Sequence, residues 1–340
     1  MNGPVFNTEI GCDLPRAIEL LKAGNLVGIP TETVYGLAGN GLSADSIFKI
    51  FEAKNRPFFD PLILHIGNME MLYELVSDVP DSCKKLIEKF WPGPLTVILP
   101  KKEIVPDLIT SGSDFVAVRM PKHQLTLKLL NSLTFPLAAP SANPFKYVSP
   151  TSALHVYQQL NGKIPYILDG GDCKIGIEST IVSFMGDEIK IQRLGGITLE
   201  EIMQEIPEAI LANQPEDHPV APGQLKHHYA PGCKLIPVDK IDSWDFELID
   251  SEKIGVILFE PTSKSELESD LKTIGISGNR IKWYVLTESG NSAEAAQNLF
   301  STLRKLDNEL LKWAIFQWAP EKELGLAIND RLTKAQYLPK

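Results

Sequence analysis

The stretch CDLPRAIELLKAGNLVGIPTETVYGL, residues 12–37, contains a predicted helix, strand and polar turn in that order, which indicates the fold class. Asp13 can cap a helix whose apolar residues recur at helical spacing, and Gly24 can end that helix in a left-handed turn. The apolar run at 26–30 predicts a strand, and polar residues follow it directly. This order of helix, strand and polar turn is typical of α/β proteins, which build their sites at strand ends.

Short apolar runs on the C-terminal side of this stretch predict further strands. They lie at 62–66, 95–99, 115–118, 136–139, 164–168, 180–184 and 189–191, with helical spacing near 43–52, 82–90, 122–131 and 151–159. These strands do not alternate regularly with helices. The pattern therefore favours a twisted mixed α/β sheet with packed helices over a simple doubly wound sheet.

Five prolines between Pro207 and Pro231 mark a break in the chain, because such a density prevents regular helix. We interpret 1–208 as a first, catalytic domain, 209–232 as a proline-rich linker covering the active site, and 233–340 as a second domain. Strand-like runs at 253–259, 281–286 and 313–318 and a helical pattern at 292–306 predict a smaller Rossmann-like α/β domain there.

The composition limits the classes of function. The 340 residues carry a formal net charge of −10, so the overall field repels nucleic acid, and any anion site must be a local concentration of positive charge. The four cysteines stand far apart without a C-x-x-C pair, which favours reduced, mostly buried thiols. No basic start precedes a long apolar run, and no stretch of about 18 apolar residues occurs. We expect a cytoplasmic protein with no membrane contact.

Arginine is scarce in the first 200 residues, where only Arg16, Arg56, Arg119 and Arg193 occur. Arg16 lies on the first predicted helix, where we expect a solvated charge. The other three follow the end of a predicted helix or strand, so they can converge on one cleft, as a triphosphate or a carboxylate requires. The alternative is a set of unrelated surface ion pairs, since 43 acidic residues are available.

Hydroxyl-rich turns lie at the ends of several predicted strands. They lie at 30–37, 140–143 and 178–180, and Ser149 before Pro150 has the form of a helix cap whose backbone N–H groups would face an anion. Each turn alone is as consistent with a structural role as with ligand binding, and their repetition favours binding. Neither a G-x-x-x-x-G-K-[ST] nor a strand-linked G-x-G-x-x-G motif is present, so a nucleotide would be held in another way.

A series of motifs in fixed order resembles one known family. They are PTETVYGL at 30–37, KNRPFFDPLILH at 54–65, WPGPLT at 91–96, VRMP at 118–121, PSAN at 140–143, ESTI at 178–181, RLGG at 193–196 and APGQLKHHYAP at 221–231. Together they resemble the YrdC-like family of L-threonylcarbamoyladenylate synthases in its long, two-domain form. So many ordered matches are more specific than any single motif.

The resemblance implies a reaction. In this family threonine and bicarbonate form a carbamate, which attacks the α-phosphate of ATP and yields threonylcarbamoyl-AMP and pyrophosphate. A downstream tRNA threonylcarbamoyl transferase then places the group on adenosine next to the anticodon. Mg²⁺ is expected on the phosphates of ATP, without an assigned protein ligand. Such a reaction needs positioning and charge neutralisation more than a protein nucleophile.

The resemblance also implies roles for individual residues. Lys54 and Arg56 are expected to be catalytic. The threonine site would contain Thr33, His65, Arg119, Ala139 through its backbone, and Ser179, with Arg119 taking the carboxylate. The ATP site would contain Lys54, Arg56, Asp60, Phe115, Ser141, Asn143, Ser149, Arg193 and Tyr229.

Some of these positions allow a second interpretation. Asp60 stands where many relatives have asparagine, and its carboxylate would repel polyphosphate unless a metal or Lys54 intervenes. A second interpretation of His65 is a core histidine held by the backbone. A second interpretation of Tyr229 is a residue with a packing role only. Trp91 and Pro94 bound a turn to which we assign only a structural role.

Two other functions compete with the synthase. A binding module would hold double-stranded RNA through its phosphates, with affinity that falls steeply with salt and no ATP turnover. The acidic chain and the lack of a long basic stripe argue against it, although a weak RNA contact stays open. Carbamoyl-transfer enzymes of hydrogenase maturation are much longer and carry paired C-x-x-C motifs, which this sequence lacks.

Overall fold

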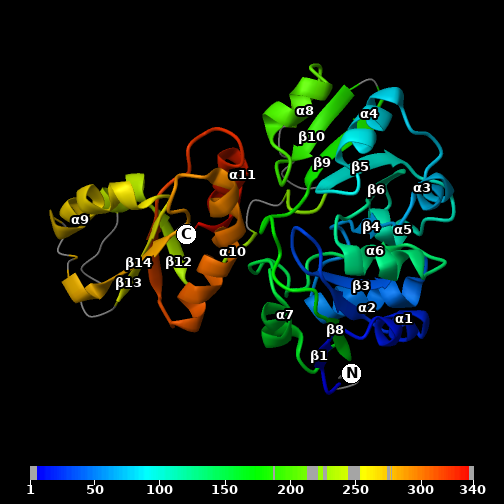
Figure 1. Ribbon diagram of the computed structural model, residues 1–340, viewed down its shortest axis with the longest axis horizontal. Helices are drawn as coiled ribbons and strands as arrows, with labels where there is room; N and C mark the ends of the chain where they lie inside the picture. The colour runs from blue at the N-terminus through cyan, green and yellow to red at the C-terminus, as the bar shows by residue number, and fades with distance from the viewer. Residues whose placement is uncertain are drawn as a thin grey trace. The chain divides into compact units, whose positions relative to one another are not determined.

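The computed structural model describes residues 6–186, 188–212, 221–224, 228–243, 253–273, 276 and 278–336. The chain forms two compact units, the first comprising Met1–Phe145 and Ser149–Lys226, the second Lys146–Val148 and His227–Lys340 (Figure 1). In the sequence, the change from one unit to the other near 226 falls inside the predicted linker 209–232. Residues 213–220 and 225–227 of that linker lie outside the described residues, and the predicted domain limits stay a prediction.

The described strands of the first unit form one eleven-stranded sheet in the order β1-β8-β2-β3-β7-β4-β6-β5-β9-β10-β11. Parallel and antiparallel pairs both occur, as in β4 with β6 and β5 with β6. The predicted mixed α/β sheet is therefore confirmed. The strands are β1 (Glu9–Gly11), β2 (Val27–Ile29), β3 (Gly36–Asn40), β4 (Ile63–His65), β5 (Leu95–Pro100), β6 (Phe115–Arg119), β7 (Leu137–Ala138), β8 (Tyr166–Leu168), β9 (Thr180–Met185), β10 (Glu188–Arg193) and β11 (Ile210–Leu211).

Helices of the first unit pack against two apolar cores. Ala17 and Leu21 of one helix share a core with Leu129 and Leu130 of another, while a larger core holds side chains such as Ile50 together with the remaining helices. The described helices are α1 (Leu14–Lys22), α2 (Ala44–Lys54), α3 (Met69–Leu75), α4 (Asp81–Phe90), α5 (Asp107–Thr110), α6 (Gln124–Asn131), α7 (Ala153–Leu160) and α8 (Leu199–Glu205).

Local signals explain where these helices begin and end. The Asp13 side chain accepts the Arg16 N–H at the start of α1, and Gly24 has a φ of +74° beyond its end, as predicted. The predicted cap at Ser149 is wrong, because Ser152 caps α7 by accepting the His155 N–H. The carbonyl of Pro150 instead accepts the Tyr35 N–H. An extended segment therefore replaces the first predicted helical turn.

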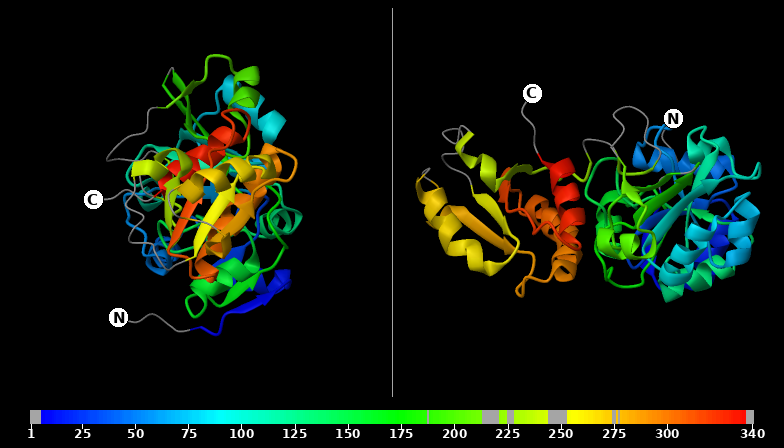
Figure 2. Two further views of the ribbon diagram at one scale, coloured as in Figure 1. Left: turned by 90° about the vertical axis from the view of Figure 1, so that its left-hand side faces the viewer. Right: turned by 90° about the horizontal axis from the view of Figure 1, so that it is seen from above.

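The second unit contains a four-stranded, all-parallel sheet in the order β12-β15-β13-β14, as a Rossmann-like domain requires. Its strands are β12 (Lys234–Pro237), β13 (Ile254–Leu258), β14 (Ile281–Val285) and β15 (Trp313–Phe316), and its α-helices are α9 (Lys264–Thr273), α10 (Ser292–Asn308) and α11 (Gly325–Ala335). Leu267 of α9 packs with Val256, whereas Gly255 faces Leu306 of α10. Helices thus cover both faces of this sheet (Figure 2).

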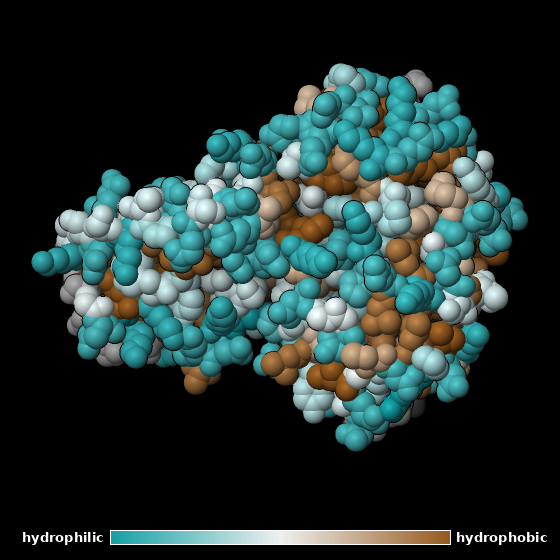
Figure 3. All heavy atoms as spheres, in the orientation of Figure 1, coloured by the Kyte–Doolittle hydropathy of each residue, from teal (hydrophilic) through white to brown (hydrophobic). Residues whose placement is uncertain are grey.

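The surface and the thiols agree with the composition. Polar and charged side chains cover much of the face shown in Figure 3, with apolar side chains between them. Cys83, Cys173 and Cys233 are buried and Cys12 is exposed, and all four are free thiols, as predicted from their wide spacing. Among the described residues, no helix combines the length and apolarity needed to cross a lipid bilayer.

Candidate active site

Strand register places two predicted site residues and one further polar residue next to one another. Arg119 ends β6, where it is paired with Thr96 of β5 on one side and with His65 of β4 on the other. Side chains of directly paired residues share a face of the sheet. Phe115 lies four residues before Arg119 on this face, half-buried against an apolar cluster of Ile63, Ile98, Ala117, Ile181 and Ala221.

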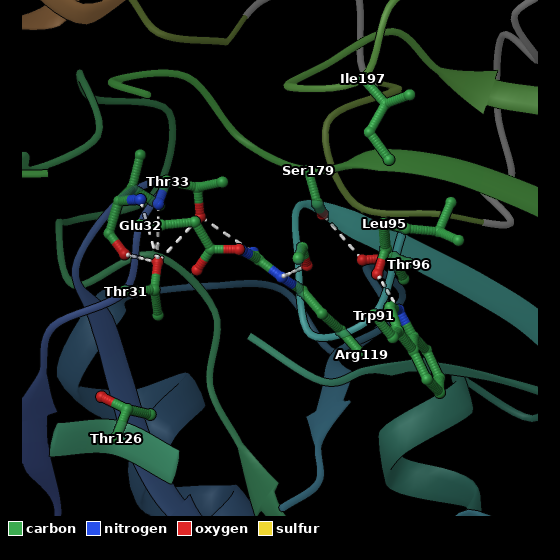
Figure 4. Close-up of polar contacts among 12 residues, drawn as sticks. Thr31, Glu32, Thr33, Trp91, Leu95, Thr96, Arg119, Thr126, Ser179 and Ile197 are labelled. Atoms are coloured by element: carbon green, nitrogen blue, oxygen red, sulfur yellow. Dashed lines mark hydrogen bonds and ion pairs between the residues drawn. The ribbon is translucent and has the colours of Figure 1, made fainter. Parts of the chain in front are cut away.

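Arg119 is 4% exposed, and each of its three side-chain nitrogens donates a hydrogen bond to a neighbouring group. Its Nη1 donates to Thr33 Oγ1 at 2.9 Å, its Nη2 to Glu32 Oε1 at 2.7 Å, and its Nε to the Gly93 carbonyl at 3.3 Å (Figure 4). We call this group, with His65, the Arg119 cluster. It presents a guanidinium and a hydroxyl side by side, which is the arrangement that binds a carboxylate.

The turn that carries Glu32 and Thr33 is fixed by its own hydrogen bonds. Thr31 Oγ1 donates to the Val34 carbonyl at 2.6 Å and accepts the Thr33 and Val34 N–H groups at 3.2 Å each. The Glu32 carbonyl accepts the Ile175 N–H at 2.8 Å. A turn held in this way aims the Glu32 and Thr33 side chains at Arg119 without further ordering.

His65 is buried beside Arg119 and contacts the backbone. Its Nδ1 lies 3.3 Å from the Ile63 carbonyl, and the backbone of Leu137 provides a second contact. Burial, reinforced by the positive charge of Arg119, lowers the pKa of His65 to about 3. The ring is therefore neutral at physiological pH, as the interpretation of a backbone-held histidine requires, and its predicted contact with threonine stays a prediction.

Ser179 connects Arg119 to the third predicted arginine. Its hydroxyl lies 2.7 Å from Oγ1 of Thr96, the residue paired with Arg119 (Figure 4). The same hydroxyl accepts from Arg193 Nη2 at 3.1 Å. Arg193 also donates to the Ser179 carbonyl from Nε and Nη2, and to the Pro222 carbonyl from Nη1. A described part of the predicted linker, 221–224, therefore contacts this region.

Lys54, at the end of α2, is fully buried at a second group of polar residues. Its Nζ donates to the carbonyls of Ser141 and, at 2.6 Å, of Asn143. Burial, followed by the neighbouring Arg56, lowers the pKa of Lys54 well below its usual range, and Asp60 opposes this shift. An anion bound here would restore the charged form of the lysine.

Arg56 and Asp60 form a buried ion pair beside Lys54. Arg56 Nη2 lies 3.0 Å from Asp60 Oδ2, and the guanidinium also donates to the Asp60 and Pro61 carbonyls. Burial raises the pKa of Asp60, while Arg56, Lys54 and Arg193 lower it. We call Lys54, Arg56, Asp60 and the backbone of Ser141 and Asn143 the Lys54 cluster. Arg193 also acts electrostatically on Asp60 and is connected through Ser179 to Thr96 beside Arg119, so it links the two clusters.

The three arginines beyond Arg16 are not surface ion pairs. Arg56, Arg119 and Arg193 are 7%, 4% and 6% exposed, so that alternative is wrong. Arg16 does form an exposed pair with Glu9, as predicted for a solvated charge.

The remaining predicted residues occupy distinct places. The Ala139 N–H is bonded to the Ile63 carbonyl, so only its own carbonyl is available to a ligand. Ser149 is buried and donates to Glu178 Oε1 at 2.6 Å. Tyr229 belongs to the second unit, where its ring stacks on Phe300 with centroids 5.5 Å apart. Its packing is thus evident, and its contact with a nucleotide stays a prediction.

Sequence reasoning missed the groups that hold the predicted residues in place. Glu32, Thr96 and Glu178 lie inside quoted motifs, yet no role was assigned to them, and the Gly93 carbonyl contacts Arg119 from a turn interpreted as structural only. A buried acid between two threonines in PTET is the one signal that could have identified Glu32 in advance.

Comparison with known proteins matches both parts of the chain to one family. The family model described as "Telomere recombination" matches residues 19–195, and the model of the "Threonylcarbamoyl-AMP synthase, C-terminal domain" matches 197–336. Threonylcarbamoyl-AMP synthase of Pyrococcus abyssi is 40% identical, covering 94% of this chain and 92% of the relative, and that of Bacillus subtilis is 36% identical, covering 95% and 92%. The crystal structure of P. abyssi Sua5 complexed with L-threonine superposes with a TM-score of 0.83 at 36% identity, over 97% of each chain.

Proposed function

The chain belongs to the threonylcarbamoyl-AMP synthase family and is an enzyme of the nucleotidyl-transferring class, and we propose that it forms threonylcarbamoyl-AMP and pyrophosphate from L-threonine, bicarbonate and ATP. The product would serve threonylcarbamoyladenosine modification of tRNA next to the anticodon, through a downstream transferase. A weak contact of this chain with RNA remains a separate hypothesis.

One observation carries the proposal: two groups of buried cations lie close to each other in the first unit. Arg119 with Thr33 suits a small carboxylate, and Lys54 with Arg56 and Arg193 suits a polyphosphate. A reaction that joins an amino acid derivative to a nucleotide needs both kinds of site within reach of each other.

On the threonine side, Arg119 would bind the carboxylate, while Thr33 and Ser179 offer hydroxyl groups and Ala139 its carbonyl. His65, neutral at physiological pH, would accept or donate one hydrogen bond without adding charge. The methyl group of threonine alone would distinguish it from serine by only about 10–200-fold.

On the ATP side, Lys54 and Arg56 would act on the reacting phosphate. The carbamate oxygen forms a bond to the α-phosphorus, the bond from that phosphorus to the bridging oxygen breaks, and pyrophosphate leaves with the electron pair. Negative charge grows on the leaving group, so fixed cations stabilise the transition state more than the ground state. Arg193, Phe115, Ser141, Asn143, Ser149 and Tyr229 would surround the rest of the nucleotide.

Mg²⁺ fits this proposal as a partner of ATP. Within the described ranges no group of three histidine, cysteine, aspartate or glutamate side chains could hold a metal ion. We therefore propose that Mg²⁺ is bound by the phosphates themselves, where it neutralises their charge. Asp60, a buried carboxylate in the Lys54 cluster, is a candidate for an additional oxygen ligand.

Release of pyrophosphate from ATP tests the proposed function. The full chain is incubated with ATP, threonine, bicarbonate and Mg²⁺, and each component is omitted in turn, with EDTA added when Mg²⁺ is omitted. We expect release only in the complete mixture. Release that persists without threonine or without bicarbonate would contradict the proposed reaction, and an exposed Arg16→Ala variant should behave as the parent does.

A further inference from the structure

Glu32 is a buried carboxylate of which only one oxygen is satisfied. It is 6% exposed, Oε1 accepts from Arg119, and Oε2 is buried without a hydrogen-bond partner among the described residues. A buried acceptor left in this way destabilises the fold, and more so when it is charged. Because the turn that carries Glu32 is fixed by its own bonds, the side chain is held in this position.

A second buried acceptor lies within electrostatic reach of Glu32. His123, just before α6, makes a backbone hydrogen bond with Gly170, and its Nδ1 is buried without a partner in the described part of the chain. The negative charge of Glu32 acts on His123 and on the buried thiol of Cys173. The titratable groups that face Glu32 are thus Arg119, His123 and Cys173, and neither the histidine nor the thiol supplies a donor to Oε2.

The pair formed by Arg119 and Glu32 matches the charges of a free amino acid. An amino acid carries its carboxylate and its ammonium on adjacent atoms, so a guanidinium that binds the carboxylate must have the ammonium nearby. Glu32 lies 2.7 Å from that guanidinium and presents an acceptor that needs an N–H donor. Binding of a zwitterion exchanges one buried ion pair for two, which offsets the desolvation of the substrate.

We propose that Glu32 binds the ammonium group of threonine and takes the proton that the amine loses before it attacks bicarbonate. This inference rests on the proposed function and adds to it the residue that generates the nucleophile.

The chemistry requires such a base. An ammonium has no lone pair, so the N–H proton first moves to the Glu32 carboxylate and leaves the neutral amine. The amine nitrogen then forms a bond to the carbon of bicarbonate, the bond from that carbon to its hydroxyl oxygen breaks, and the departing hydroxide takes the second amine proton as water. Carbamate and water are formed, and Glu32 returns its proton to solvent.

The experiment compares two ligands on the full chain by titration calorimetry: L-threonine and 2,3-dihydroxybutanoate, which has a hydroxyl in place of the amine. In Glu32→Gln, which keeps the shape and an acceptor for Arg119, we expect affinity for threonine to fall at least about tenfold. Affinity for the amine-free analogue should stay the same or rise. Because a general base contributes about 10²–10⁴-fold, kcat for pyrophosphate release should fall by at least about 100-fold.

A matched control and a second variant complete the design. Glu9→Gln makes the same chemical change in the exposed pair with Arg16 and should alter neither affinity nor kcat. Glu32→Asp keeps the charge and should retain more kcat than Glu32→Gln. It also carries the test if circular dichroism shows that the glutamine variant does not fold, through a kcat that falls more than threonine affinity does.

Two results would overturn the inference. Equal loss of affinity for both ligands would show that Glu32 only orients Arg119, and an unchanged kcat in Glu32→Gln would show that another group takes the proton. Failure of the proposed function is a different result, because the parent protein itself would then release no pyrophosphate that depends on threonine.

Discussion

The Arg119 cluster and the Lys54 cluster are built alike, and each pairs a buried guanidinium with a buried carboxylate. In the proposed function, Glu32 would face a substrate that carries a positive ammonium as well as a carboxylate. Asp60 would face a triphosphate, which carries negative charge only. The same kind of ion pair would therefore complement one substrate and oppose the other.

The presence of a buried ion pair therefore does not show whether its carboxylate favours or opposes ligand binding. Removing one partner is costly in either cluster, since it leaves a charge unpaired in the interior. Only the charge of the ligand decides whether the carboxylate helps binding. In the Lys54 cluster the carboxylate is paired with Arg56, and Lys54 and Arg193, which both act on Asp60, would limit its cost to the proposed phosphate binding.

The largest effect is expected from Arg119→Ala. It removes the contact with the threonine carboxylate, so threonine-dependent pyrophosphate release should fall at least about 100-fold, since each hydrogen bond to a charged group contributes about 1.5–3 kcal/mol. The sequence gives no reason to expect a loss of stability, but the structure does, because Glu32 would stay buried without its cation. Denaturant unfolding should show a cost of about 3–5 kcal/mol.

The double variant Arg119→Met with Glu32→Gln separates these two effects. It removes both charges, so most of the lost stability should return while release stays absent. If the double variant is as unstable as Arg119→Ala, the ion pair is not the source of the cost.

A smaller effect concerns His65, the uncharged neighbour of Arg119. Its folded pKa of about 3 lies below the ordinary value of 6.5, so the unfolded chain binds the proton first and stability is lost as the pH falls through 6.5 toward 3. By pH 5 this loss amounts to about 2 kcal/mol. The unfolding free energy of His65→Asn, measured from pH 8 to pH 5, should show a shallower decline than that of the parent. Parallel curves would mean that His65 does not control acid stability.

The smallest effect is expected from Asp60→Asn, which tests directly whether the carboxylate of the Lys54 cluster opposes ATP binding. The change removes a like charge beside the triphosphate and keeps the backbone carbonyls that hold Arg56, so KM for ATP should fall by about threefold. Because burial raises the pKa of Asp60, the parent loses stability as the pH rises from 4 to 7, so the stability of the variant relative to the parent should increase over that range. A KM that rises instead would identify Asp60 as a ligand of the Mg²⁺ that accompanies ATP.

Periodicity and capping predicted most elements of the first unit. Helix α1 follows from Asp13 and Gly24, and β4, β5 and β6 lie within one or two residues of the apolar runs that predicted them. The error at α7 has a clear cause: Ser149 and Ser152 are both suitable caps, and the sequence does not show that the Pro150 carbonyl bonds to Tyr35. Strand order was equally out of reach, because it depends on long-range pairing.

The candidate site could be predicted only in part. The basic and hydroxyl residues lie at element ends and repeat in recognisable motifs, so they could be selected before their positions were known. Their partners could not, because Glu32, Thr96 and the Gly93 carbonyl gain significance only through contacts across the sheet. The sequence identifies the charged residues that a ligand needs. The fold identifies the hydrogen-bond partners that position those residues.

The Arg119 and Lys54 clusters are proposed to form one site that makes an adenylate. Mass spectrometry of the nucleotide product is the direct test of this proposal. The full chain is incubated with ATP, L-threonine and bicarbonate labelled with carbon-13, and the product is isolated before it decomposes. The account predicts an adenylate with the mass of threonylcarbamoyl-AMP that contains the labelled carbon. A threonyl adenylate without the label, or no adenylate at all, would contradict it.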